Sequence, residues 1–301
     1  MRPTFLAFHT ASRALAASQA NMDVTGNNIA NVNTKGYTRQ RVDLSSISNG
    51  GYTQKYAVPT ADVGLGVDVS RISQIRDPFL DARYRDQASE NGKFETILAG
   101  LTDLENIFDE ISTEGLLHEI SKFVNSLQSL AQTPSAGDIA QVVRTAAQKV
   151  TQIMNVYAKQ INQVRSQQVF DLSQVVINND FNTKVKNIAD LNAQIRQEQT
   201  YGNVPNELLD KRNLLIDELA ELANIKVTSQ PEKISEDLTV ERLTISLYDP
   251  TTGASIGLVD GELYNTLHVK DDGERISIQI ATSFGPHGGA DITNHFTGGS
   301  I

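Results

Sequence analysis

The first 36 residues carry a regular series of positions that a helix would place along one side. These positions step by three and four residues, the spacing of a coiled-coil seam: Phe5, Phe8, Ser12, Leu15, Gln19, Met22, Gly26 and Ile29. Several are apolar and the others are small or polar, so such a helix would be marginal alone in water. The pattern predicts one helix over residues 1–36, ended by Gly36, that needs a partner helix from its own chain or from a neighbouring copy. An ordinary surface helix docked on a core fits the same pattern.

The pattern then changes to the alternation of a strand. Residues 50–72 are predicted to be extended, because apolar residues alternate there with small or polar ones: Val63, Leu65, Val67 and Val69. Asp77 and Pro78 follow, and they suit the N-cap and the first position of a helix. We therefore expect a long helix to begin at Pro78.

Three helical stretches are predicted after Pro78. The first has an apolar stripe at steps of three and four: Phe94, Leu98, Leu101, Leu104, Phe108 and Ile111. The second runs from Leu116 to about Gln132. The third, from Asp138 to Tyr201, contains neither Gly nor Pro and would be roughly 90 Å long as one helix. Its apolar phase drifts around residues 167–171, so two shorter helices broken near Phe170 remain an alternative.

The last third of the chain predicts one more helix and then strands. Over residues 206–219 an amphipathic helix is expected, with Asp210, Arg212 and Asp217 as solvated pairs that are worth little. After Lys226 the apolar residues alternate, which predicts a small antiparallel unit followed by a loop-like, Gly-rich tail. The fold class is therefore α+β, mainly α: an elongated helical bundle or coiled coil with a small antiparallel β part. Its expected parts are residues 1–75, 76–225 and 226–301.

Composition and charge exclude several classes of protein. The chain has no Cys, which removes disulfides, thiol nucleophiles and thiolate metal sites. Its net charge is −10, which argues against nucleic-acid binding. Residues 1–41 nevertheless carry +4, so an organellar transit peptide is a minor alternative for this segment. No apolar run approaches the roughly 18 residues that a membrane-spanning helix needs.

Catalytic constellations are not evident in the sequence. There is no phosphate-binding loop, no nucleophile elbow and no zinc-protease motif. His287 and His295, with Asp291 between them, form a weak candidate metal site in the Gly-rich tail. The acidic runs on the predicted helices are more simply solvated faces. We therefore expect no enzyme and no cofactor, and we keep a metal-binding or hydrolytic module in the β part as the less favoured alternative.

The most informative motif lies between Thr25 and Gln40. Asn is unfavourable inside a helix, because its amide competes for backbone hydrogen bonds. A helix that keeps several is expected to use them for lateral contacts, although a frayed, Asn-rich helix end is the simpler alternative. The string from Asn27 to Tyr37, NNIANVNTKGY, resembles the N-terminal signature of bacterial flagellar rod, hook and hook-associated proteins. Residues 64–87 resemble the same axial proteins, and residues 206–227 resemble the hook-associated proteins of the hook–filament junction.

The resemblance implies a structural adaptor subunit that joins the flagellar hook to the filament by self-assembly. The implied partners are a ring of identical copies, the hook protein, an adjacent hook-associated or filament protein and a flagellar export chaperone, without nucleic acid or membrane insertion. The implied location is the extracellular flagellum, reached by flagellar type III secretion without a cleaved signal. Another axial protein, from the hook or the distal rod, is the alternative.

The family also implies which residues are involved and what the chain lacks. Proteins of the junction run well past 301 residues and return to a C-terminal helix that pairs with the N-terminal one, so we expect this chain to be truncated at its C-terminal side. The expected assembly interface combines the apolar seam with the signature: Phe5, Phe8, Leu15, Met22, Asn27, Asn28, Ile29, Asn31, Asn33, Gly36 and Tyr37. The four asparagines are expected to make hydrogen bonds between subunits.

Overall fold

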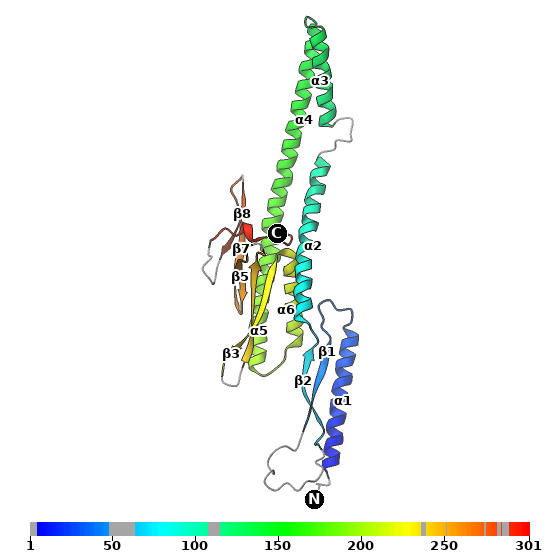
Figure 1. Cartoon of the computed structure of the whole chain (residues 1–301), viewed down its shortest axis with the longest axis vertical. Helices are drawn as coiled ribbons and strands as arrows, with labels where there is room; N and C mark the ends of the chain where they lie inside the picture. The colour runs from blue at the N-terminus through cyan, green and yellow to red at the C-terminus, as the bar shows by residue number, and fades with distance from the viewer. Residues whose placement is uncertain are drawn as a thin grey trace.

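The computed structural model is an elongated molecule whose helices run mainly along its long axis (Figure 1). It describes residues 5–47, 64–107, 115–235, 239–250, 252–273, 275–281, 284 and 289–301. A terminal helix and a β-hairpin lie at one end, and a helical hairpin projects at the other (Figure 1). Small antiparallel sheets flank the helices between them. This arrangement confirms the expected mainly-α, elongated α+β class.

The helical elements follow one another along most of the chain. They are α1 (Leu6–Ala30), α2 (Pro78–Ile107), α3 (Leu116–Gln132), α4 (Gly137–Phe170), the π-helix η1 (Asp171–Phe181), α5 (Asn182–Thr200), α6 (Asn206–Leu222) and the short 3₁₀-helix η2 (Thr293–His295). The start of α2 is as predicted, because the Asp77 carboxylate accepts a hydrogen bond from the N–H of Phe79 at 2.9 Å.

Within the described ranges the strands form three antiparallel sheets. The first pairs β1 (Gln40–Ser46) with β2 (Val67–Gln74). The second has the order β3 (Ile225–Lys233), β4 (Thr239–Tyr248), β5 (Ser255–Asp260) and β6 (Leu263–Tyr264). The third pairs β7 (Thr266–Asp271) with β8 (Ile276–Ala281). Strands after Lys226 were predicted, whereas β1 was not, and Val63 of the predicted extended stretch lies outside the described residues.

Helix α1 is shorter than its predicted span of residues 1–36. It ends at Ala30, and a turn follows up to Gly36, whose φ is +82°. The amide of Asn31 donates hydrogen bonds back to the carbonyl oxygen of Asn27 at 3.0 Å and to its side-chain oxygen at 2.7 Å. The prediction of an uninterrupted helix to Gly36 was therefore wrong, because asparagine side chains compete for the helix backbone before glycine is reached.

The third predicted helix is one unbroken helical run over α4, η1 and α5. At residues 171–181, next to the place where the apolar phase drifts, the chain becomes π-helical instead of breaking. Two core positions there, Leu172 and Ile177, are five residues apart, which fits i→i+5 bonding. The alternative of two separate helices is thus wrong.

The hydrophobic core lies where η1, α5 and α6 meet the second and third sheets. Its fully buried large side chains include Phe181, Ile188, Ile216, Ile245 and Leu258. The predicted stripe of α2 has the opposite environment: Phe94, Leu98 and Leu101 are 58–66% exposed. The last two members of that stripe, Phe108 and Ile111, lie outside the described residues.

The tail has no helix or strand after η2, in agreement with its loop-like prediction, but its last residues are firmly docked. The N–H of Gly299 donates to the carbonyl oxygen of Ser89 in α2 at 2.8 Å. The N–H groups of Ser300 and Ile301 donate to carbonyl oxygens at the end of α6, at 3.0 and 3.1 Å. These bonds satisfy carbonyl groups that a helix C-terminus otherwise leaves unpaired. We call residues 297–301 the clip, because they fasten α6 to α2.

Candidate assembly surface and the joint that carries it

Helix α1 has two different sides. Ala17 and Val24 are 4% and 9% exposed, on the side that packs on the β1–β2 hairpin. The apolar residues of the predicted seam lie on the open side and are 61–72% exposed: Phe5, Phe8, Leu15, Met22 and Ile29. A row of large exposed apolar side chains along one side of a helix is typical of an interaction surface. The structure thus places the five large apolar residues of the predicted seam along one side of α1 that the other described residues leave exposed.

The signature asparagine Asn28 ties α1 to the hairpin. Its Nδ2 donates to the carbonyl oxygen of Gln40 at 2.9 Å, and its Oδ1 accepts from the N–H of Gln40 at 2.9 Å. The hydroxyl of Tyr37 donates to the same Oδ1 at 2.9 Å. Burial and the nearby charge of Asp210 raise the pKa of Tyr37, which keeps this hydroxyl protonated as a donor. The amide of Asn28 is therefore used inside the chain, a role that the sequence pattern did not reveal.

The turn that follows α1 lies against α6. Gly36 packs on Leu214 so closely that a β-carbon at Gly36 would be 3.1 Å from that side chain. Its positive φ also favours glycine. Lys35 forms an ion pair with Glu218 at 3.3 Å. Asn33 is exposed at the outer edge of this turn. Of the predicted interface residues, Gly36 thus lies against α6, next to the ion pair of Lys35 with that helix.

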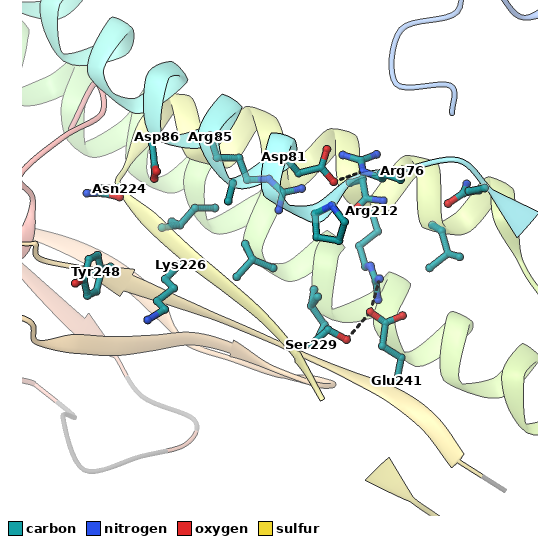
Figure 2. Close-up of a pocket in the computed structure, with 18 residues that line it drawn as sticks. Arg76, Asp81, Arg85, Asp86, Arg212, Asn224, Lys226, Ser229, Glu241 and Tyr248 are labelled. Atoms are coloured by element: carbon teal, nitrogen blue, oxygen red, sulfur yellow. Dashed lines mark hydrogen bonds and ion pairs between the residues drawn. The ribbon is translucent and has the colours of Figure 1, made fainter. Parts of the chain in front are cut away.

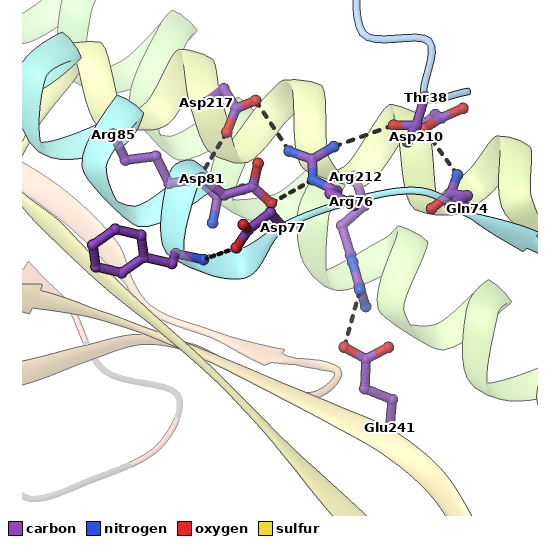
Figure 3. Close-up of polar contacts among 11 residues, drawn as sticks. Thr38, Gln74, Arg76, Asp77, Asp81, Arg85, Asp210, Arg212, Asp217 and Glu241 are labelled. Carbon is purple, nitrogen blue, oxygen red and sulfur yellow. Dashed lines mark hydrogen bonds and ion pairs between the residues drawn. The ribbon is translucent and has the colours of Figure 1, made fainter. Parts of the chain in front are cut away.

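The same side of α6 holds the chain that leaves β2 and enters α2. Gln74 donates to the carboxylate of Asp210 at 2.9 Å (Figure 3). Asp217 accepts from Arg85 at 2.7 Å and pairs with Arg76 at 3.5 Å, and Arg76 also pairs with Asp81 (Figure 3). We call this set the joint: the α6 residues that hold the signature turn and the β2–α2 segment, namely Asn206, Asp210, Leu214, Asp217 and Glu218.

The prediction that Asp210, Arg212 and Asp217 are solvated pairs was wrong. Asp210 and Arg212 are only 8% and 4% exposed. Arg212 donates to Asn192 at 3.2 Å and to Glu241 at 3.3 Å, across to α5 and β4. Burial lowers the pKa of Arg212, and the charge of Glu241 opposes that shift. The apolar periodicity of the sequence identified the side of α6 that faces the core. It did not show that the polar side is also packed, because it cannot reveal that α2 covers that side of α6.

A cavity of about 590 Å³ opens beside Arg212, between the start of α2, α6 and strands β3 and β4 (Figure 2). Its three arginines, Arg76, Arg85 and Arg212, already have carboxylate partners within the chain. The cavity is thus lined by an ionic network that links these elements, in which the buried Nε of Arg212 has no hydrogen-bond partner within the described chain.

Among the described residues, no group of three or more His, Cys, Asp or Glu side chains could hold a metal ion. His287, one of the two predicted candidates, lies outside them. No helix within the described ranges combines the length and the apolar character that a membrane-spanning segment needs.

Replacement of Asn28 by alanine is expected to loosen the hairpin from α1. It leaves both backbone groups of Gln40, a residue only 9% exposed, without their side-chain partner. We expect a loss of about 1–2 kcal/mol of local stability and faster hydrogen exchange at the Gln40 amide. Asn33→Ala is the matched control, because Asn33 is an exposed signature asparagine and its replacement should change exchange little. Equal exchange in the two variants would contradict this role of Asn28.

Together, the terminal helix, the joint and the long helices define an elongated, mainly helical protein with an exposed apolar seam at one end. The chain belongs to the family of the flagellar hook-associated protein FlgK helical domain, whose model matches residues 101–301. A second model, of the flagella basal body rod protein, matches residues 8–38, which contain the signature and all of the seam except Phe5.

Relatives of known name agree with this family. The chain is 37% identical over 229 residues to flagellar hook-associated protein 1 of Bacillus subtilis, which covers 76% of this chain and 45% of the relative. It is 28% identical over 233 residues to flagellar hook-associated protein 1 of Salmonella typhimurium, covering 73% and 38%. The chain thus spans less than half of the length of these curated relatives.

A solved structure shares the fold. The flagellar hook junction protein FlgK from Burkholderia pseudomallei matches with a TM-score of 0.54 and 21% sequence identity, covering 73% of this chain and 37% of that one. At this identity the likeness supports the arrangement of the elements and no more.

Proposed function

We propose that this chain is part of a structural adaptor subunit that joins the hook to the filament of the bacterial flagellum. The observation that carries the proposal is the uncovered apolar seam of α1 on a chain of the hook-associated family. A helix that leaves five large apolar side chains in water gains stability when partner helices cover them. The free energy of that burial would drive assembly with neighbouring copies and with other axial proteins.

The joint determines how the seam would act in an assembly. Helix α1 contacts the rest of the described chain mainly through the hairpin, and the joint fastens that region to α6 through ion pairs and hydrogen bonds. A force applied at the seam would pass through the joint into the long helices α2 and α4. This connection suits a subunit that carries load between two helical structures.

The proposed partners follow from the same surfaces. Copies of the chain would form a ring through the seam, and the hook protein and a filament-side protein would contact the two ends of the elongated molecule. We further propose export by flagellar type III secretion with the help of a chaperone, and an extracellular location. A structural role without catalysis is in keeping with the ionic groups around the joint, which are paired with one another.

Cells that lack the gene test this function. We expect electron micrographs to show hooks without attached filaments, and we expect the intact gene to restore the filaments. A gene that encodes Leu15→Asp with Met22→Asp should fail to restore them, because two charges are placed in the seam. Ala14→Asp is the control, since Ala14 is exposed on α1 and is not three or four residues from any seam position. Normal filaments in the deletion strain would contradict the proposed function.

A further inference from the structure

The π-helix η1 joins a projecting helical hairpin to the core. Figure 1 shows α3 and α4 extending beyond the sheets, while α5 continues the same helical run among them. None of the residues of α4 is buried, whereas Ile177 and Phe181 of η1 are completely buried. The transition between projecting helix and core helix therefore falls within η1.

The part of this run where η1 meets α5 is held against the core, so it cannot turn about the helix axis. The amide of Asn182, at the start of α5, pairs with both backbone groups of Leu267 in β7, at 2.9 and 2.8 Å. The buried side chains of Ile177 and Phe181 fix the same turns in the core. Side chains at this end cannot rotate about the helix axis without leaving the core.

The other part of the run, helix α4, is bound to α3. Glu119 of α3, which is only 2% exposed, accepts hydrogen bonds from Lys122 and from Lys149 of α4, both at 2.9 Å. The two lysines lower the pKa of Glu119, in keeping with a carboxylate held between two cations. Helix α3 therefore follows the side of α4 on which Lys149 lies.

The number of residues per turn in η1 then decides where α3 lies. An α-helix advances about 100° per residue, whereas i→i+5 bonding lowers this advance to roughly 80°. Over the eleven residues of η1 the difference adds up to roughly 200°, more than half a turn. We infer that η1 is a rotational register element, which sets the side of the molecule on which the hairpin carries α3. This inference does not rest on the proposed function, although it would determine which side of the hairpin meets a neighbour.

Deletions within η1 test the inference, because the number of residues there sets the total rotation about the helix axis between α4 and α5. Nine α-helical residues and eleven π-helical residues both advance about 900°. Deletion of the exposed pair Gln174 and Val175 should therefore give an α-helix with α3 on its original side. Deletion of Gln174 alone leaves ten residues, which as an α-helix turn about 100° further than the original π-helix does. With helix axes about 9 Å apart, that rotation would move α3 by roughly 10–15 Å.

The movement can be measured by distances between spin labels in the purified chain, which has no cysteine of its own. Labels at Gln128→Cys in α3 and at Gln230→Cys in β3 form one pair, and Gln128→Cys with Glu207→Cys in α6 forms a second. We expect both distances to be retained in the two-residue deletion and at least one to change by several ångströms in the one-residue deletion.

Each result of the distance measurements either supports or overturns the inference. Loss of folding in the one-residue deletion, with the two-residue deletion folded and its distances retained, also supports the inference, because only one variant then violates the register. Equal distances in both deletions, or altered distances or unfolding in the two-residue deletion, would overturn it. Neither outcome depends on whether the protein joins hook to filament.

Discussion

Asp217→Asn is expected to lower the free energy of unfolding by about 3 kcal/mol. Asp217 is the one carboxylate that Arg76 and Arg85 share, and the side chain of Arg85 is only 10% exposed. Without the negative charge, the guanidinium of Arg85 stays partly buried without an ionic partner, which costs more than the lost pair was worth. The side chain of Asp217 is 23% exposed, so water screens part of this cost.

The neighbouring residue supplies a matched control. Glu218 lies on the same helix and also pairs with a cation, but its partner Lys35 has a side chain that is 76% exposed. Glu218→Gln should therefore change stability by less than about 1 kcal/mol. Urea unfolding monitored by circular dichroism measures both variants. Similar midpoints for the two variants would show that the joint does not depend on burial of its charges.

Gly92→Ala is expected to destabilise the chain by about 2–3 kcal/mol, although alanine is the better helix former. A β-carbon at Gly92 would overlap the backbone oxygen of Glu221, and it would lie 3.4 Å from the nitrogen of Ser300. Either α2 must move away from α6 or the clip must leave its place. Both changes break hydrogen bonds that the clip makes with the end of α6.

Gly26→Ala is the control for helix propensity. Gly26 also lies inside a helix, α1, and a β-carbon there would meet no atom within 4 Å. This substitution should stabilise its helix by about 0.5–1 kcal/mol. Urea midpoints and hydrogen exchange at Ser300 and Ile301 report on the two variants. An increase in stability for Gly92→Ala would show that α2 and α6 are not held as closely as the clip requires.

Much of the helical framework could be predicted from apolar periodicity. The start of α2 follows from Asp77 and Pro78, the unbroken run from α4 to α5 from the lack of Gly and Pro, and α3 and the helix over residues 206–219 from regular spacing. The position of η1 was visible as a drift in the spacing of the apolar residues. That it is a π-helix was not visible, because a change in residues per turn and a break in the helix disturb this spacing in the same way. Strand β1 was missed, since Gln40 to Ser46 alternate only weakly between apolar and polar residues.

The polar contacts were the least predictable part of the site. Asp210 and Arg212 have the residue types of a solvated helix face, and only the packing of α2 and α5 against α6 buries them. The backbone pairing of Asn28 with Gln40 depends on the fold of the hairpin, which no local pattern specifies. The seam, in contrast, was predictable because its residues avoid contacts within the described chain.

Thiol labelling of the seam tests the central claim, that this side of α1 is open in the single subunit and covered in the flagellum. Since the chain has no cysteine, Leu15→Cys and Met22→Cys each introduce a single reactive group, and the buried position Ala17→Cys serves as the control. We expect rapid maleimide labelling at both seam positions in dilute monomer, protection in isolated flagella, and slow labelling of the control in both. Seam positions that are already protected in the monomer, or that stay reactive in intact flagella, would contradict it.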